Sequence, residues 1–494
     1  MTPQPMGHTG KSAGRAPVAG ALVAMLILAG CASTHGLKPQ AELTGADTLA
    51  AGRALTGTSV DPAAWPAQDW WTRFGDPQLD QLMREALAGS PSLKVALARA
   101  RQASALADQA NAARSPRVDS SLSATRERFS ANGVIPPPFA GGWTTFDQLQ
   151  ATLSWDIDFW GKNRAAFEQA LGLARSAAVD AQAAQLALSV DMAHAYVQLL
   201  RAYLQLDVAQ ATVAQRERIL ALTRERNAAG IDSRLELKQA EAAVPAAREQ
   251  VEQLNETIAL TRNQMAALLG QGPDRGLAIE RPAAMASADA ALPSQVPSQL
   301  LGRRPDIVAQ RWRVEAARRG IHVAQTQFYP DVNLTAFVGF QSLGTSSFLS
   351  LGSRQLGVGP ALSLPLFDAG QRRANLAAAD AQYDAAVEQY NQTLSDALRE
   401  VVDQLSSFRS LARQRVEQQE ALAASRDAYD LATLRYREGV GNYLQVLSAE
   451  APLLTQEALE VDLRARALDL SIKLVRALGG GLQEPSAAVA SATP

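Results

Sequence analysis

The chain has few of the residues that enzymes and metal sites concentrate. Its 494 residues include one cysteine and four histidines, which leaves little for a disulfide framework or a metal site. Phe, Trp and Tyr make up only 5% of the residues, so much of the 47% hydrophobic content is alanine, which favours helices. The 47 basic and 49 acidic residues nearly cancel, and no basic excess points to a nucleic-acid partner.

Catalytic constellations are also missing from the sequence. We find no Ser/His/Asp elbow, no metal-ligand cluster and no complete phosphate loop, since Pro5 replaces the first glycine of the partial motif at residues 7–12. His194 and His322 occur singly in helical patterns. An envelope enzyme is therefore the least supported class, and we expect no cofactor and no metal.

The N-terminus has the pattern of a secretion signal. A basic segment precedes a small, apolar stretch at residues 17–30, too short to span a bilayer comfortably. It ends in Leu-Ala-Gly before Cys31, which resembles a bacterial lipobox. We predict a lipoprotein signal peptide at 1–30. We also predict that Cys31 is acylated, with palmitate among the acyl groups, which would tether this end to lipid. Ala32 is compatible with outer-membrane sorting. The alternative is an ordinary signal that happens to precede a cysteine.

The dominant feature that is present is an internal repeat. Residues 153–270 align with residues 362–479 without a gap, at an offset of 209 (362 − 153 = 209; 479 − 270 = 209). The matched pairs include Gly161 with Gly370, Arg226 with Arg435, and Gly230 with Gly439. The predicted order is a tether at 31–68, structural repeats at 69–293 and 294–481, and a disordered tail at 482–494.

Each repeat carries the patterns of a β-hairpin and of two long helices. Alternating apolar and polar residues predict hairpins at 118–159 and 331–367. Long stretches follow at 162–229 and 371–438, with no proline, a single glycine, and apolar residues at steps of three and four, as in coiled coils. Return helices complete the pairs 162–269 and 371–478. At 1.5 Å per residue, each longer helix would be roughly 100 Å long.

Glycine, proline and capping residues mark the turns of this plan. The turns at the far ends of the helix pairs contain Gly230, Asp232 and Ser233 in the first repeat and Gly439 and Gly441 in the second, with Asp232 or Ser233 as a helix N-cap. The transitions between strands and helices are predicted at Pro116, Gly161, Pro330 and Gly370.

Four amphipathic strands per chain raise a geometric problem. Strands that enter a membrane must belong to a closed barrel, because lipid satisfies no backbone polar group. Four strands cannot close, since small barrels need about eight. A membrane interpretation therefore requires an oligomer whose subunits share one barrel, which the long helices would continue as a tube. The alternative is two hairpins packed on a soluble core, with the helices as a coiled-coil spacer.

Several motifs together resemble the outer membrane factors, the TolC-like exit ducts of bacterial tripartite efflux pumps, and most closely their lipoprotein, NodT-type branch. The motifs are WWTRFGDP at 70–77, LSWDIDFWG at 153–161, LGRRPDI at 301–307, LSLPLFDAG at 362–370 and ALGGG at 477–481. The resemblance implies a mixed α/β membrane protein. Its homotrimer would form a twelve-stranded β-barrel, four strands per chain, continuous with a long periplasmic α-helical coiled-coil tunnel.

The resemblance also implies a function and partners. Such a duct passively conducts drugs or other small molecules from an inner-membrane RND-type pump, through a periplasmic adaptor protein, to the exterior. The helix-tip turns would contact the adaptor, and outer-membrane lipid would surround the barrel. The alternative from another class is a lipid-anchored periplasmic coiled-coil scaffold that never inserts.

The resemblance places a periplasmic gate at the ends of the long helices. Tyr436 matches the gate tyrosine of the family, and Glu236 matches its acidic partner in the first repeat. Some members line the mouth with two aspartates where this chain has Gln445 and Ser448. Because Gln445 is the equivalent of Glu236 (445 − 236 = 209), any carboxylate ring would come from Glu236. The alternative for each residue is ordinary solvated helix-end chemistry.

Overall fold

The computed structural model describes residues 65–283 and 302–482, together with residues 34, 36–45, 48, 49 and 285. The predicted signal peptide, Cys31 and the tail beyond Leu482 lie outside the described residues. The chain divides into two compact units. Unit 1 takes its described residues from the N-terminal segment up to Leu43 and from 101–175 and 312–389. Unit 2 takes the others.

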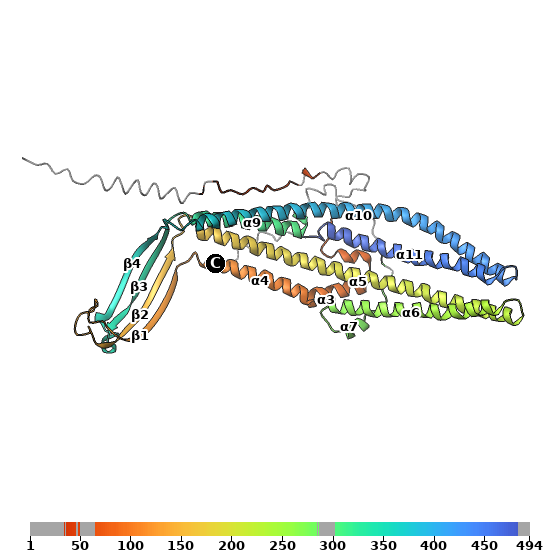
Figure 1. Ribbon diagram of the computed structural model, residues 1–494, viewed down its shortest axis with the longest axis horizontal. Coiled ribbons are helices and arrows are strands. Elements are labelled where there is room, and N and C mark those ends of the chain that lie inside the picture. Colours follow the sequence, from red (N-terminus) through yellow and green to blue (C-terminus); the bar gives the residue numbers. More distant parts are fainter. Residues whose placement is uncertain are drawn as a thin grey trace, which may run out of the picture. The chain divides into compact units, whose positions relative to one another are not determined.

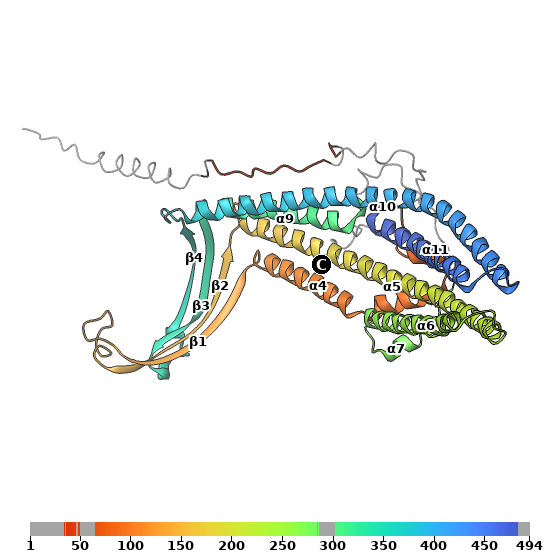
Figure 2. The same ribbon diagram turned by 45° about the vertical axis from the view of Figure 1, so that its right-hand side comes forward.

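Two successive runs of elements have the same order, with shorter helices, a hairpin, a long helix and a return helix (Figures 1 and 2). The first run comprises η2 (Trp70–Phe74), α3 (Pro77–Gly89), α4 (Pro91–Ala112), β1 (Arg117–Arg128), β2 (Trp143–Asp156), α5 (Lys162–Ala228), α6 (Arg234–Leu268) and α7 (Asp274–Leu277). The second comprises α9 (Pro305–Thr326), β3 (Asp331–Leu343), η3 (Thr345–Ser347), η4 (Leu351–Ser353), β4 (Arg354–Ser363), α10 (Gln371–Arg437) and α11 (Tyr443–Ala477). Both long helices have 67 residues and both return helices have 35.

Aspartate caps start both long helices after a left-handed glycine. The Asp158 carboxylate accepts hydrogen bonds from the backbone N–H groups of Asn163 and Arg164, at 3.1 and 2.8 Å. Before α10, the Asp368 carboxylate accepts from the backbone N–H groups of Gly370 and Arg372, each at 3.1 Å. Gly161 and Gly370 have φ values of 76° and 90°. Such bonds satisfy N–H groups that the first turn of a helix leaves open. Strand β2 ends at Asp156, three residues before the expected end of the hairpin, and the capping loop follows.

The four strands form one antiparallel sheet in the order β1-β2-β3-β4. The register puts apolar residues on one face, such as the row Val118, Leu153, Ala336 and Val358. The other face is polar, and its row contains Ser121, Gln150, Gly339 and Gln355. There the Gln355 amide donates to Gln150 Oε1 at 3.3 Å, past Gly339 on the strand between them.

Unit 2 has an aromatic core around the start of α3. Trp70, Phe74 and Tyr196 are buried together, and the Tyr196 hydroxyl donates to Asp76 Oδ2 at 2.6 Å. Asp76 also caps α3 by accepting from the backbone N–H groups of Gln78 and Leu79. One carboxylate therefore both starts the helix and holds α5 against it.

The turn that ends α11 lies very close to other backbone segments. Gly479, Gly480 and Gly481 all have positive φ, and a Cβ atom on Gly479 would lie 2.1 Å from the carbonyl oxygen of Arg303. Next to this turn the Arg304 guanidinium binds Asp306, Glu400 and the carbonyl of Ala477. Glycine is needed here for both conformation and space.

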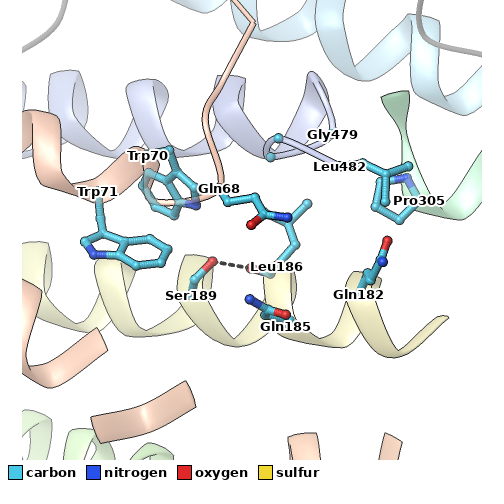
Figure 3. A pocket seen from close by; sticks show the side chains of 12 residues that line it. Gln68, Trp70, Trp71, Gln182, Gln185, Leu186, Ser189, Pro305, Gly479 and Leu482 are labelled. Carbon is cyan, nitrogen blue, oxygen red and sulfur yellow. Dashed lines mark hydrogen bonds between the residues drawn. The ribbon is translucent and has the colours of Figure 1, made fainter. Parts of the chain in front are cut away.

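A small cavity lies beside this turn (Figure 3). Its volume of about 40 Å³ suits one to a few water molecules and is far below the several hundred Å³ of sites for small organic ligands. The Trp70 indole nitrogen and Gln182 Oε1 are buried without a hydrogen-bond partner, and both residues line the cavity. The cavity therefore has the size and polarity of a water site.

None of the described helices is long and apolar enough to cross a membrane.

We predict that Gly479→Ala destabilises unit 2 much more than Gly230→Ala. Both glycines have positive φ, which costs an alanine about 1–2 kcal/mol, but only at Gly479 would the new methyl group meet backbone atoms. Thermal unfolding followed by circular dichroism measures the difference. Equal Tm losses in the two variants would contradict the close-contact explanation.

Candidate functional site

The α5–α6 turn is closed by local hydrogen bonds. Gly230 has φ 75°, and the N–H groups of Ile231 and Asp232 donate to the carbonyl of Arg226, at 2.9 and 3.4 Å. Ser233 then caps α6 and Glu236 completes a capping box, with its carboxylate accepting from the Ser233 backbone N–H and hydroxyl. These bonds hold the turn in one conformation.

The α10–α11 turn has the same geometry with different side chains. Gly439 has φ 77°, and the N–H groups of Val440 and Gly441 donate to the carbonyl of Arg435, at 3.0 and 2.9 Å. Asn442 caps α11, and Gln445 is its capping-box partner. A Cβ atom on Gly441 would lie 3.1 Å from backbone atoms of Arg435 and Tyr436. A larger residue at 441 would press against the end of α10.

A buried polar cluster joins the two turns, which lie at the same end of unit 2 (Figures 1 and 2). The Arg226 guanidinium donates to both carboxylate oxygens of Asp232, at 3.0 and 3.2 Å, and to the carbonyl of Tyr436 at 2.8 Å. The Tyr436 hydroxyl donates to Asp232 Oδ2 at 2.5 Å and lies 2.9 Å from the Thr223 hydroxyl. We call Thr223, Arg226, Asp232 and Tyr436 the latch.

The latch is shielded from solvent, which strengthens its interactions. Tyr436 is fully buried (0% exposed), and Arg226 Cζ lies 4.4 Å from its ring centre, a cation–π contact. Burial, together with the hydrogen bond to Asp232, raises the pKa of Tyr436 to about 12. Burial alone would raise the pKa of Asp232, but hydrogen bonds from Arg226 and Tyr436 outweigh it and lower that pKa. The cluster thus holds an ionised carboxylate and a neutral phenol.

The latch draws different residues from the two repeats. At the offset of 209, Asp232 corresponds to Gly441, and Tyr436 corresponds to Asn227. Arg226 is nearly buried in the latch, whereas its equivalent Arg435 is exposed. The first repeat therefore supplies the ion pair and the second supplies the tyrosine, so that one polar cluster crosses between the two turns.

A second layer of contacts lies along the helices behind the latch. Tyr443 packs 6.1 Å from the Tyr436 ring within a cluster of apolar side chains from α5, α6, α10 and α11. Arg216 donates to Glu450 Oε1 at 3.2 Å and to the carbonyl of Ala243 at 3.0 Å, which joins α5, α6 and α11. Glu450 is buried, while its equivalent Glu241 in the first repeat pairs with the exposed Lys238.

The chain matches a known family over most of its length. The model of the family described as "Outer membrane efflux protein" matches residues 82–271 and 296–480. The chain belongs to the outer membrane efflux protein family. This membership confirms the resemblance drawn from the motifs and the outer-membrane location predicted from the sequence.

Relatives of this chain include proteins named for resistance to drugs or to fusaric acid. The fusaric acid resistance protein FusA of Burkholderia cepacia is 42% identical over 363 residues, 73% of this chain and 68% of that protein. The multidrug resistance outer membrane protein MdtP of Escherichia coli K12 is 31% identical over 429 residues, 85% and 88% of the two chains. The crystal structure of the outer membrane protein VceC of Vibrio cholerae superimposes with a TM-score of 0.80, at 38% identity, over 85% of this chain and 100% of that one.

The predicted gate residues lie at the two turns but make different contacts. Tyr436 is in the latch, and its hydroxyl bonds Asp232 and Thr223. The Glu236 carboxylate binds Ser233 of its own turn, and Gln445 binds Asn442. Ser448 is exposed and donates to the carbonyl of Leu444, one helical turn earlier. Of the helix-tip residues, Asp232 has its carboxylate turned into the latch.

The sequence analysis did not identify Arg226 and Thr223 as partners of Tyr436. One signal was present: Arg226 is matched by Arg435, but only the first turn has an aspartate within reach, at 232. An Arg and an Asp six residues apart across a glycine turn suggest a local ion pair, but nothing local indicates a tyrosine 204 residues away.

The predicted junction residues Pro116, Gly161, Pro330 and Gly370 lie between helices and strands. No group of His, Cys, Asp or Glu side chains in the described residues is placed to hold a metal ion.

We predict that Asp232→Ala loosens both turns. The change leaves the nearly buried Arg226 guanidinium without its carboxylate, which typically costs about 3–5 kcal/mol. Hydrogen–deuterium exchange of peptides covering residues 226–236 and 435–445 should accelerate. Glu241→Ala, which removes an exposed pair with Lys238, serves as the control and should leave exchange nearly unchanged.

The latch should be stable across a wide pH range. Because its pKa is lowered, Asp232 stabilises the folded state above the ordinary Asp pKa of about 3.9, and this stability is lost as pH falls through the lower folded value. Because its pKa is raised to about 12, Tyr436 stabilises the folded state below its ordinary pKa of about 10, and this is lost as pH rises through 12. A nitroxide spin label attached to the cysteine of a Val440→Cys variant should show the same restricted mobility at every pH from about 4 to 10. Asp232→Asn should abolish the acid transition.

Proposed function

We propose that this chain forms the outer-membrane exit duct of a tripartite efflux pump. The duct conducts drugs or other small molecules passively to the exterior, from an inner-membrane RND-type transporter and a periplasmic adaptor protein. The observation that carries the proposal is the two-faced, four-stranded sheet, which has an open edge on each side among the described residues. Membership of the efflux family supports the same class of function.

The open edges support a homotrimer. The outer sides of β1 and β4 have unpaired backbone groups in the described part of the chain, and lipid cannot satisfy them. The strands alternate in direction, so β4 of one copy can pair antiparallel with β1 of the next. Three copies would close twelve strands, whereas four strands are too few to enclose a barrel.

The two faces of the sheet support a conducting lumen. The apolar face, with Trp155 and Leu334 paired across it, would meet lipid. The polar face, with Gln150, Ser154 and Asp156, would line an aqueous path. The long helices α5 and α10 and the return helices α6 and α11 would continue that path through the periplasm, with Pro116, Gly161, Pro330 and Gly370 at the barrel–tunnel turns.

The latch is suited to act as the closed state of a periplasmic gate. It ties the α5–α6 turn to the α10–α11 turn through the Asp232 carboxylate and through the bond from Arg226 to the carbonyl of Tyr436, so that movement of one turn away from the other must break both bonds. Glu236 and Gln445 keep the turns in shape as capping residues, and a ring of Glu236 carboxylates at the mouth remains part of the proposal. Ser448 would line the same mouth.

Exposed apolar residues at both turns support the adaptor contact. Ile231 and Leu235 in the first turn, and their equivalents Val440 and Leu444 in the second, are each more than 60% exposed. Two matched apolar pairs at the ends of polar helices are typical of a protein–protein contact. The turn residues would present these pairs. They are Gly230, Asp232 and Ser233 in the first repeat and Gly439 and Gly441 in the second. At the other end of the chain, acyl groups on Cys31 would hold the duct in lipid.

We predict that the purified protein migrates as a heat-modifiable trimer and conducts ions in planar lipid bilayers. Tyr436→Phe with Asp232→Asn should raise the conductance several-fold, because the two changes remove the Tyr436–Asp232 hydrogen bond and leave only the bond from Arg226 to the carbonyl of Tyr436 in the latch between the turns. Glu241→Gln is the matched control. Glu236→Gln separately tests for a ring of Glu236 carboxylates, whose loss should change the ion selectivity of the channel.

Each arm of this experiment rejects a different part of the proposal. A soluble, non-conducting oligomer after removal of lipid would reject the duct and favour the coiled-coil scaffold. Conduction that is unchanged in the latch variant would leave the duct in place and reject the latch as its gate.

A further inference from the structure

We propose that the seam between two copies of the sheet binds the phosphate group of an outer-leaflet lipid, held by Arg354 of one copy and by Arg126 and Arg128 of the next. We call these three residues the seam arginines. The proposal rests on the proposed duct, because the seam exists only where β4 of one copy pairs with β1 of another.

The seam arginines lie at the end of the sheet that is remote from the helices. Strand β1 ends at Arg128 and β4 begins at Arg354, and both of these ends adjoin loops between strands. At their other ends β1 follows α4 and β4 leads to α10. In the proposed duct the helices extend into the periplasm, so the seam arginines lie at the exterior end of the barrel.

The seam arginines share the apolar face of the sheet. Arg126 and Arg128 continue the period of Leu122 along β1, and Arg354 precedes Leu356 on β4 at the same period of two. Leu122 is 71% exposed and Leu356 is 78% exposed, as expected for side chains that meet lipid. Three guanidinium groups therefore lie on the face that would contact the membrane.

The lengths of the two edge strands limit which residues meet across the seam. Strand β4 has 10 residues and β1 has 12. An antiparallel pairing that uses all of β4 places Ser363 opposite residue 117, 118 or 119, and Arg354 opposite residue 128, 127 or 126 (363 − 354 = 9; 128 − 119 = 9; 126 − 117 = 9). Directly opposite residues share a face, which excludes residue 127. Arg354 is thus directly opposite Arg126 or Arg128 in both remaining registers.

This pairing brings like charges together only when copies assemble. Directly opposite residues have Cβ atoms about 4.5–5.5 Å apart, and like charges in that position destabilise a sheet. Within one chain, β1 and β4 are three inter-strand spacings apart, or roughly 14 Å. An anion between the guanidinium groups would replace the repulsion at the seam by attraction from both sides.

The seam arginines have donors left to bind such an anion. Arg128 Nε donates to the carbonyl of Gly141 at 3.2 Å, and Arg354 Nε donates to the carbonyl of Leu351 at 3.0 Å. Both bonds go to adjoining loops and leave the terminal NH₂ groups without a partner among the described residues. The Arg126 guanidinium makes no hydrogen bond or ion pair with the described chain.

Other charged residues of the sheet differ from the seam arginines. Arg117, at the opposite end of β1 and on the polar face, donates to the Asp119 carboxylate through Nε and Nη2, at 3.0 and 2.9 Å. Asp147 is the one carboxylate on the apolar face of the four strands. It is buried (3% exposed), lies on β2 and makes no ion pair with a described residue. The exterior end of the apolar face therefore has a net positive charge.

Two tryptophans place the seam arginines at the level of lipid head groups. Trp143 is directly opposite Arg128 and 66% exposed, and tryptophan is enriched at membrane surfaces. Trp155 lies on the same face, 12 residues further along β2 (155 − 143 = 12). That length of strand is about 40 Å, which covers about 28 Å of depth at a tilt of about 45°, close to the thickness of a hydrocarbon core. The pair would thus mark the two membrane surfaces.

The surroundings of the seam arginines decide the class of ligand. An arginine fork binds two oxygens of a phosphate at once. Below the arginines, toward the middle of the membrane, the same face carries exposed Leu356 and Val358, which suit acyl chains. A phosphorylated lipid matches both the charge and the apolar surface, whereas free phosphate matches the charge alone.

The first test measures the register across the seam by oxidative cross-linking of the full-length protein in outer-membrane fragments. Arg354→Cys combined with Arg126→Cys, or with Arg128→Cys, should give covalent oligomers in at least one of the two variants. Arg354→Cys with Leu122→Cys is the matched control, because Leu122 shares the row of Arg354 within one chain but lies three strands away. Cross-links in neither arginine pair, or equal cross-linking of the control, would overturn the seam site.

The second test measures the ligand on the purified oligomer in dodecyl maltoside micelles. Diphosphoryl lipid A, a phosphorylated glycolipid, should slow the heat-induced conversion of oligomer to monomer by at least about tenfold. The same lipid without its phosphates should have no effect. Inorganic phosphate at equal concentration distinguishes the sources, since an equal effect would show an adventitious ion only and overturn the lipid assignment.

Variants separate phosphate binding from a structural role. Arg126→Gln/Arg128→Gln/Arg354→Gln should lose the effect of lipid A. Arg126→Gln removes no hydrogen bond of the described chain, so it should weaken the effect without making the oligomer less stable in lipid-free micelles. Arg117→Gln, on the same strand, is the matched control and should respond as the wild type does. A triple variant that keeps the full effect would overturn the site.

Failure of the duct and failure of the seam site have different signatures. If no heat-modifiable oligomer forms, both proposals are rejected. If the oligomer forms and conducts ions but its stability is indifferent to lipid phosphates, the duct remains and the seam site is rejected.

Discussion

The open backbone edges of the four-stranded sheet are the constraint on which the rest of this protein depends. Strands β1 and β4 each have a partner on one side only within the described chain, and lipid offers none. In the proposed duct, an apolar face in contact with lipid and edges that cannot stay unpaired there are reconciled because several copies close one sheet. The alternating strand directions make β4 and β1 suitable partners for that closure.

Two turns of equal geometry carry unequal chemistry. Each has a left-handed glycine, two N–H groups on one arginine carbonyl and a capping box. Only the first has Asp232, and only the second has Tyr436, with Gly441 where a side chain would press on the helix end. Because one carboxylate receives bonds from both turns, the bond between them depends on how the two helix pairs are packed. That dependence is what a gate requires.

Residues 40–44 of the N-terminal tether are positioned by hydrogen bonds from their backbone. The N–H groups of Gln40 and Ala41 donate to Asp384, and the N–H group of Thr44 donates to Asn391. The apolar contact of Leu37 with the cluster around Leu376 alone would let an extended segment slide, and the two bonds to the Asp384 carboxylate fix its position.

The sequence by itself determined the elements, because periodicity, caps and glycines are local signals. The long helices end one residue before the expected bounds of 229 and 438, and Ser233 is the cap of α6. The tertiary structure decided the order of the four strands and the partners of Tyr436. The resemblance places Glu236 at the gate, where its role stays a prediction, and in this structure its carboxylate binds within its own capping box, three residues away. Tyr436 contacts Asp232 and Arg226, because contacts across some 200 residues depend on how the helix pairs pack, for which a sequence has no local signal.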